Sequence, residues 1–129
     1  LNHESMELSK ESYQELAVGL EKGREIVNQA PRQAAELVYK LMNLGDHEGA
    51  LRVGLFLIEN SKDPSPHLYN NVAWLLSETG DTTSRAVEYA KKAIHLLKAT
   101  DDAKYRRFHL DFRDTLAQAE RTARKSVNT

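Results

Sequence analysis

Residues 69–94 read YNNVAWLLSETGDTTSRAVEYAKKAI, and they decide the fold of this chain of 129 residues. Apolar residues recur at three- and four-residue steps on both sides of a central Gly80–Asp81 pair. This spacing is typical of amphipathic helices, and glycine commonly ends one helix where a capping residue starts the next. The stretch therefore predicts a helix over about 67–79, a corner at Gly80, and a second helix that begins after residues 81–84.

The same arrangement occurs 35 residues upstream, where Gly45 and Asp46 separate two further amphipathic segments. The pattern before the first glycine, Ala34-x-x-Leu37-Val38-x-x-Leu41, matches Tyr69-x-x-Val72-Ala73-x-x-Leu76 before the second. Small residues follow each corner, and they would let two antiparallel helices approach closely. These residues are Ala50 and Gly54 in the first copy and Ala86 and Ala90 in the second. The sequence therefore predicts two tandem helical hairpins, at about 31–65 and 66–100.

Helical spacing also flanks the two hairpins. Ser12 and Glu15 form a capping-box pattern in a predicted helix at about 10–29, and an apolar stripe predicts a last helix at about 102–124. Each would cap the array, because one hairpin cannot bury its own apolar face. No stretch shows the alternation that is typical of strands. We therefore expect an all-α fold, an antiparallel helix-hairpin array of about six helices.

The length of the chain favours one domain, which we expect to span residues 10–124. Residues 1–9 are polar and acidic, and we expect them to be disordered. Residues 125–129 follow the last predicted helix at the end of a basic and polar stretch, and we expect them to fray.

The repeat resembles the tetratricopeptide repeat, a helical hairpin of about 34 residues with an aromatic, a large, a small and a bulky residue in its first helix. Residues 69–94 carry the best match, and residues 31–65 follow the pattern with Ala34 and Gly54 at its aromatic places. Residues 111–119 (DFRDTLAQA) look like the opening helix of a third unit. The resemblance implies a right-handed α-solenoid with a concave face lined by the first helix of each hairpin.

In this family the concave face binds a peptide or a protein, so the resemblance implies candidate partner-binding residues. Asparagine suits peptide capture because its amide both donates and accepts, and Trp74 offers a flat apolar area with a polar tip. The alternative that the last helix covers Trp74 as part of the core stays open. The candidates for the groove are Tyr39, Asn43, His67, Asn70, Asn71, Trp74, Glu78 and Gln118.

Some members of this family bind the carboxylate terminus of a peptide through a clamp of lysine and asparagine. Asn71 occupies one matching place in this chain. Ala35 and Tyr39 stand at two others, where the clamp has a lysine and an asparagine. We therefore do not expect that specific activity here.

These features favour a non-catalytic module for protein–protein interaction. One alternative is a self-associating structural domain, in which Leu55 and Phe56 would pack against another copy, because an ordinary repeat would leave them towards solvent. Another is a regulatory fragment of a larger protein. The expected partner is a protein or a peptide, with a homo-oligomer as the alternative.

Composition and motifs exclude several other classes of function. The chain has 18 Lys and Arg against 19 Asp and Glu, a net charge of −1, whereas nucleic-acid binders are usually basic. It has no Cys, its five His residues form no paired metal motif, and no glycine-rich phosphate loop occurs. We therefore expect no enzyme activity, no cofactor and no metal. No apolar run approaches the ~18 residues of a membrane span, so we expect no membrane and a cytoplasmic location.

Charge is unevenly distributed along the chain. Residues 1–90 hold 8 basic and 14 acidic side chains, whereas residues 91–129 hold 10 basic and 5 acidic ones. The basic residues could form a surface for an acidic partner, and a solvated helix exterior is the simpler interpretation. The residues concerned are Lys91, Lys92, Lys98, Lys104, Arg106 and Arg107.

Overall fold

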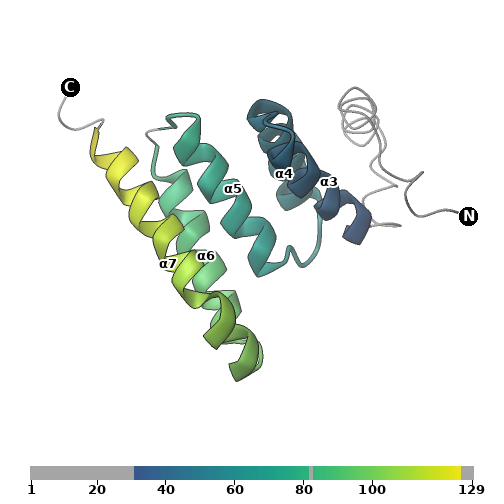
Figure 1. Ribbon diagram of the computed structural model, residues 1–129, viewed down its shortest axis with the longest axis vertical. Helices are drawn as coiled ribbons and strands as arrows, with labels where there is room; N and C mark the ends of the chain where they lie inside the picture. The colour runs from purple at the N-terminus through teal and green to yellow at the C-terminus, as the bar shows by residue number, and fades with distance from the viewer. Residues whose placement is uncertain (1–30, 82, 126–129) are drawn as a thin grey trace, which may run out of the picture. The chain divides into compact units, whose positions relative to one another are not determined.

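The computed structural model describes residues 31–81 and 83–125, and every regular element among them is a helix. The helices are α3 (Pro31–Asn43), α4 (His47–Asn60), α5 (Pro66–Glu78), α6 (Arg85–Lys98) and α7 (Asp102–Lys125) (Figure 1). The expected all-α class is therefore confirmed for the described residues. The helix expected at 10–29, the expected disorder at 1–9 and most of the tail lie outside them.

The described part of the chain divides into two compact units, one within residues 31–61 and the other within residues 62–125. In the described part, the first unit holds α3 and α4, and the second holds α5, α6 and α7. The boundary falls close to the point where the sequence predicts the second hairpin to begin. The helices of each predicted hairpin thus lie in a unit of their own.

The two Gly–Asp pairs form the same kind of corner. Gly45 and Gly80 both have φ of +81°, a left-handed conformation that glycine adopts without the steric cost of a Cβ. The Gly45 and Asp46 N–H groups donate to the carbonyls of Met42 and Leu41, both at 3.0 Å. The Gly80 and Asp81 N–H groups likewise donate to Ser77 and Leu76, at 3.2 and 2.9 Å. Each helix therefore ends in a Schellman motif, and the two motifs lie 35 residues apart.

The first unit contains the hairpin of α3 and α4, which pack against each other. The two helices bury aliphatic side chains together with small residues, as the sequence pattern predicts. From α3 these are Leu37, Val38 and Leu41, and from α4 they are Ala50, Val53 and Leu57, with Gly49 and Gly54.

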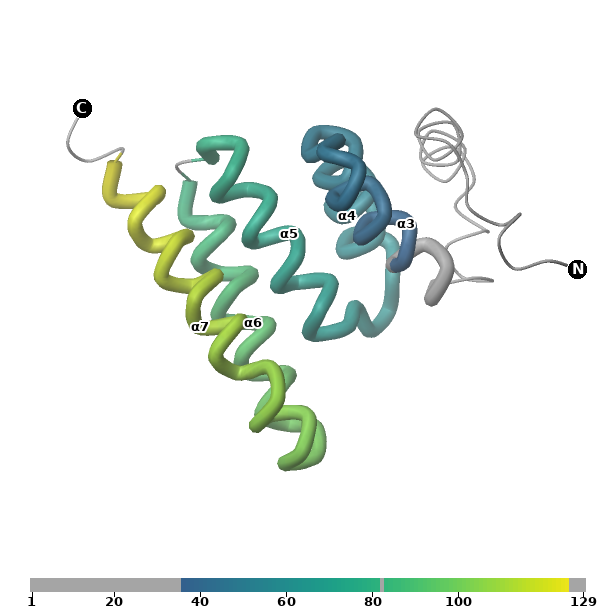
Figure 2. Tube along the Cα trace, in the orientation of Figure 1, coloured from purple at the N-terminus to yellow at the C-terminus, as the bar shows by residue number. Residues whose placement is uncertain are grey.

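The second unit is a three-helix body in which α6 packs against α5 and α7, and α5 packs against α7 (Figure 2). Ala86, Ala90 and Ala93 of α6 are fully buried, so neighbouring backbones can come close to this helix. Ala93, Leu97 and Phe112 form its apolar cluster, with partly buried aromatic and aliphatic side chains around them. The surrounding residues are Tyr69, Ile94, Tyr105 and Phe108.

Two threonines lie on the buried side of α7, where an unpaired hydroxyl would be costly. Each hydroxyl donates to the carbonyl four residues earlier, Thr115 to Asp111 at 3.2 Å and Thr122 to Gln118 at 3.0 Å. With Phe112 and Ala119 they form one buried row at three- and four-residue steps. α7 therefore packs against both helices of the second hairpin.

Candidate functional site

α5 and α7 are joined by two contacts near the ends of their common face. At one end the His67 ring meets Phe108 and Phe112 edge-on, with ring centroids 4.6 and 5.3 Å apart. At the other end Gln118 Nε2 donates to Glu78 Oε1 at 3.1 Å. The N-terminal end of α5 thus contacts the N-terminal half of α7, and the C-terminal end of α5 contacts a later turn of α7. The two helices therefore run in the same direction.

Four of the predicted groove residues form one row along α5. His67, Asn71, Trp74 and Glu78 follow one another at steps of four, three and four residues, which places them on one side of a helix. The two outer members make the contacts with α7 described above. The two inner members, Asn71 and Trp74, are both half-buried and lie between these contacts.

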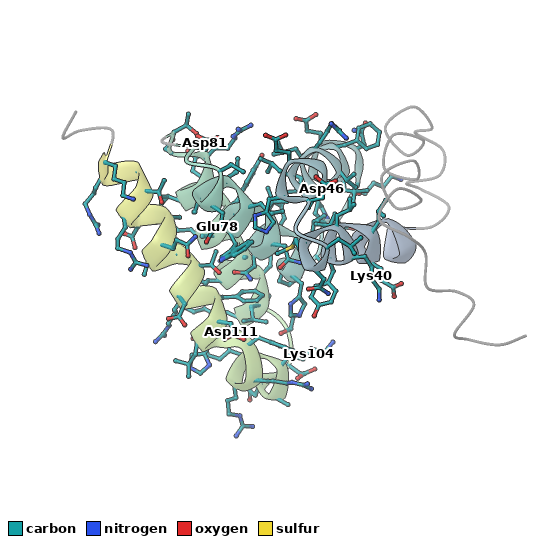
Figure 3. The ribbon with its side chains drawn as sticks, turned by 45° about the horizontal axis from the view of Figure 1, so that its top comes forward. Lys40, Asp46, Glu78, Asp81, Lys104 and Asp111 are labelled. Carbon is teal, nitrogen blue, oxygen red and sulfur yellow. The ribbon has the colours of Figure 1, made fainter. Side chains whose placement is uncertain are left out.

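A matching polar row runs along α7. Lys104, Asp111 and Gln118 are spaced by seven residues, two helical turns, and so share one side of the helix. Gln118 binds Glu78, and the positive charge of Lys104 acts on His67, so this side is turned towards α5. We call the two rows together the α5–α7 face; Figure 3 labels Glu78 on α5 and both Lys104 and Asp111 on α7.

The surroundings of His67 favour the neutral form of its imidazole, although the residue as a whole stays exposed near the start of α5. Burial against the two phenylalanine rings and then the nearby charge of Lys104 lower the pKa of the imidazole below its ordinary value of 6.5. A neutral imidazole has one N–H donor and one acceptor nitrogen. His67 therefore packs onto α7 chiefly as an aromatic ring near neutral pH.

The two neighbouring asparagines of α5 differ in accessibility. The Oδ1 atom of Asn70 is fully enclosed and has no hydrogen-bond partner among the described residues. Asn71 has no enclosed unpaired polar atom, and its amide makes no hydrogen bond within the described part of the chain. The Asn71 amide is therefore open to an incoming group, whereas a partner cannot reach the Asn70 oxygen in this conformation.

The structure brings together five of the eight predicted groove residues. They are His67, Asn71, Trp74, Glu78 and Gln118. Asn70 adjoins them on α5, with its oxygen enclosed. Tyr39, which is 56% exposed, and Asn43 lie on α3, in the other unit.

The pair proposed for self-association, Leu55 and Phe56, lies on α4. Both side chains are half-buried, so other parts of the chain already cover part of their surface. The carbonyl of Phe56 accepts a hydrogen bond of 2.8 Å from Asn60 Nδ2. Their apolar surface is thus smaller than the sequence pattern alone suggests.

Sequence reasoning missed Lys104 as a member of this face and Phe108 as a residue that contacts it. It treated the apolar residues of the last helix, Phe108 among them, as one stripe without a partner, and it assigned Lys104 to a general basic surface. The seven-residue spacing of Lys104, Asp111 and Gln118 is the signal that could have grouped them. The contact of Phe108 with His67 joins residues 41 positions apart, and no local pattern indicates it.

The α5–α7 face offers groups for recognition: an amide, an indole, two carboxylates and an ammonium group. Within residues 31–81 and 83–125, no three His, Asp or Glu side chains gather in a way that could hold a metal ion. No helix in that part of the chain has both the length and the apolar character needed to cross a membrane. Comparison with known proteins found no matching family model, no matching curated protein and no matching solved structure.

Proposed function

We propose that this chain is a non-catalytic module that binds a peptide or protein partner, built as a short tetratricopeptide-like array. The two Gly–Asp corners support the array, because they repeat one set of backbone hydrogen bonds at the 35-residue spacing of the sequence copies. The packing of α7 on both α5 and α6 supports its role as the capping helix. The partner binds on the α5–α7 face.

One observation carries this proposal: Asn71 and Trp74 lie between two fixed contacts, and the Asn71 amide makes no hydrogen bond among the described residues. The edge-on contacts of His67 and the hydrogen bond of Glu78 hold both ends of the row against α7. Such a pre-formed surface loses little conformational entropy when a partner binds.

The groups on this face suit an extended peptide segment. The Asn71 amide can donate to a backbone carbonyl and accept from a backbone N–H. The half-buried indole of Trp74 supplies apolar contact area, and tryptophan is enriched among the residues that dominate binding energy. The exposed carboxylates of Glu78 and Asp111 and the ammonium group of Lys104 would orient the charged groups of the partner.

Trp74 allows a direct test, because it is the only tryptophan in the chain. Peptides selected from a random display library against the whole chain should change the fluorescence of Trp74 when they bind. Asn71→Ala should lower their affinity by about tenfold, the effect of one lost hydrogen bond of ~1–1.5 kcal/mol. Competition and titration by fluorescence would measure both effects.

Lys91→Ala is the matched control, since this exposed residue lies on α6 and outside the α5–α7 face. It should leave the affinity unchanged. Both variants should keep the circular dichroism spectrum and melting temperature of the parent chain. If the selected peptides bind Asn71→Ala as tightly as the parent and leave Trp74 emission unchanged, the proposed site is wrong.

A further inference from the structure

The outward side of α7 carries an apolar residue between arginines. Arg106, Leu110 and Arg113 follow one another at steps of four and three residues, on the side of the helix opposite the buried Phe112 and Thr115. Leu110 is 63% exposed, the largest exposure of any large apolar side chain in the described residues. Arg107 is also exposed and borders this row.

Each of the three arginines is held by a partner other than a carboxylate. Arg106 Nε lies 3.4 Å from the carbonyl oxygen of Asp102, and Arg113 Nη2 lies 3.4 Å from the hydroxyl of Tyr105. The Arg107 guanidinium carbon lies 5.1 Å from the centroid of the Phe108 ring, a cation–π contact.

None of these three arginines forms an ion pair within the described residues, whereas Arg85 pairs with Asp81 at 2.6 Å. Among the described residues, no carboxylate therefore lies within ion-pairing distance of their guanidinium groups. Since the guanidinium groups are already partly ordered, less side-chain entropy is lost when an anionic partner binds them.

We propose that this surface, the arginine face formed by Arg106, Arg107, Leu110 and Arg113, binds an acidic amphipathic segment of a protein partner. Carboxylates of the partner would pair with the guanidinium groups, which match them in planar, two-pronged geometry. An apolar side chain of the partner would cover Leu110. The arginine face is thus a second interaction surface, in which Arg106, Leu110 and Arg113 lie on the other side of α7 from the α5–α7 face and Arg107 lies between the two faces.

An acidic protein segment fits this surface better than a nucleic acid does. Leu110 lies in the middle of the row, and a phosphate backbone has no apolar group to cover it. A short segment with alternating acidic and apolar residues satisfies both the guanidinium groups and the leucine.

The surface also refines the basic region that the sequence indicates. Lys104 and Arg106 are two residues apart, about 200° around the helix, and so they point to different sides of α7. Lys104 acts on His67 at the α5–α7 face, whereas Arg106 belongs to the arginine face. Lys91 and Lys92 are exposed on a different helix, α6.

The test uses the whole chain and a fluorescent synthetic peptide of glutamate and leucine, followed by fluorescence anisotropy. The double variant Arg106→Glu/Arg113→Glu should weaken binding of this probe by at least tenfold. Leu110→Ser should weaken it by about tenfold, as expected for one leucine that is no longer buried. Added salt should weaken binding to the parent chain more than binding to the double variant.

Lys91→Glu/Lys92→Glu makes the same charge change on exposed positions of α6 and should bind the probe nearly as well as the parent chain. If it loses as much affinity as the arginine variant, binding follows net charge alone and the proposal is overturned. It is also overturned if a probe with serine in place of leucine binds equally well, or if a single-stranded oligonucleotide binds more tightly than the peptide.

Circular dichroism checks the fold of every variant. If Arg106→Glu/Arg113→Glu lowers the helical signal, Arg106→Gln/Arg113→Gln replaces it, because glutamine is a good helix former and introduces no negative charge. This neutral variant should still reduce the affinity for the acidic probe several-fold. Unchanged affinity in a folded glutamine variant would contradict the proposal.

Discussion

The two Gly–Asp corners end their first helices identically but start their second helices differently. Asp46 caps α4 directly, because its carboxylate accepts a 3.0 Å hydrogen bond from the N–H of Gly49. Asp81 instead accepts a 2.8 Å bond from the N–H of Thr83 and pairs with Arg85. α4 therefore begins at His47, one residue after its aspartate, whereas α6 begins at Arg85.

The sequence contains the reason for this difference. A Cβ added to Gly49 would lie 2.8 Å from the Asp46 side-chain Cγ, so the tight cap requires a residue without a side chain. The second copy has one more residue between its corner glycine and its first alanine, Ala86, than the first copy has before Ala50. The two copies thus share the glycine that ends the first helix. They differ in how the second helix starts, because the second copy has one more residue at this point.

The two described hairpins also differ in their surroundings. α7 covers the second hairpin, and Phe112 joins the apolar cluster of Ala93 and Leu97 while its ring also meets His67. The first unit, within residues 31–61, contributes two helices of its own. The candidate binding face of the second unit therefore depends on the packing of α7 against the hairpin. It does not depend on a difference between the two Gly–Asp corners.

The largest expected effect comes from removing that cover. Phe112→Ala should lower the free energy of unfolding of the second unit by about 3–5 kcal/mol, because a side chain only 2% exposed leaves a cavity. Urea denaturation followed by Trp74 fluorescence measures this unit, since Trp74 lies on α5. Leu110→Ala, an exposed position on the same helix, is the control and should change the free energy of unfolding little. Equal effects of the two variants would show that α7 does not cover the hairpin.

The equivalence of the two corners predicts equal costs for their glycines. Gly45→Ala and Gly80→Ala should each lower the free energy of unfolding by about 1–2 kcal/mol, since both residues have φ of +81°. No atom would contact an added Cβ at either position, so only the backbone conformation contributes to the cost. Asparagine at the same positions should cost less, because it tolerates this conformation better. Thermal denaturation of the four variants checks this, and a large difference between the two alanine variants would contradict the shared geometry.

The different helix starts predict unequal effects of the two aspartates. Asp46→Ala should lower the free energy of unfolding by about 0.5–2 kcal/mol, the usual cost of a lost N-cap. Asp81→Ala should cost less than about 1 kcal/mol, because it removes an exposed bond and an exposed ion pair. Urea denaturation followed by circular dichroism measures both. If Asp81→Ala proves more costly than Asp46→Ala, the assignment of the cap to the first corner is wrong.

The hairpins were predictable because their signals are local. Gly45, Asp46, Gly80 and Asp81 combine a helix end and a helix start within two residues, and the apolar spacing places the helices between them. The start of α6 was less predictable in detail. Its N-cap residue, Ser84, makes no side-chain capping bond, and the N–H of Arg85 donates instead to Thr83 Oγ1 at 3.3 Å, in a turn that Asp81 holds through Thr83 and Arg85.

The candidate site was only partly predictable, because its contacts join residues far apart in the sequence. The row of His67, Asn71, Trp74 and Glu78 follows from helical spacing, and the resemblance to a known repeat indicated its use. Helical spacing does not identify which residue a side chain will meet. The pairing of Glu78 with Gln118, 40 residues later, depends on how α5 and α7 pack.

The smallest expected effect tests the contact of His67 with α7 through pH. Burial and then Lys104 lower the pKa of His67 in the folded chain below 6.5, its ordinary value. At a pH between the pKa of His67 in the folded chain and its pKa in the unfolded chain, the unfolded chain binds more protons than the folded chain does. The stability contributed by His67 is therefore complete above about pH 6.5, and it is lost as the pH falls through the folded-state pKa. His67→Gln should therefore show a smaller loss of melting temperature than the parent chain when the pH is lowered through this range.

A second variant separates the two causes of this shift. Lys104→Gln removes the nearby positive charge, so the pKa of His67 should rise towards its ordinary value but stay below it, since burial against Phe108 and Phe112 remains. An NMR titration of the His67 ring protons measures this pKa in both chains. An unchanged pKa in Lys104→Gln would place Lys104 away from the α5–α7 face. If the pKa of His67 returns fully to its ordinary value, the ring is not packed against Phe108 and Phe112. The N-terminal end of the α5 row would then lack its contact with α7.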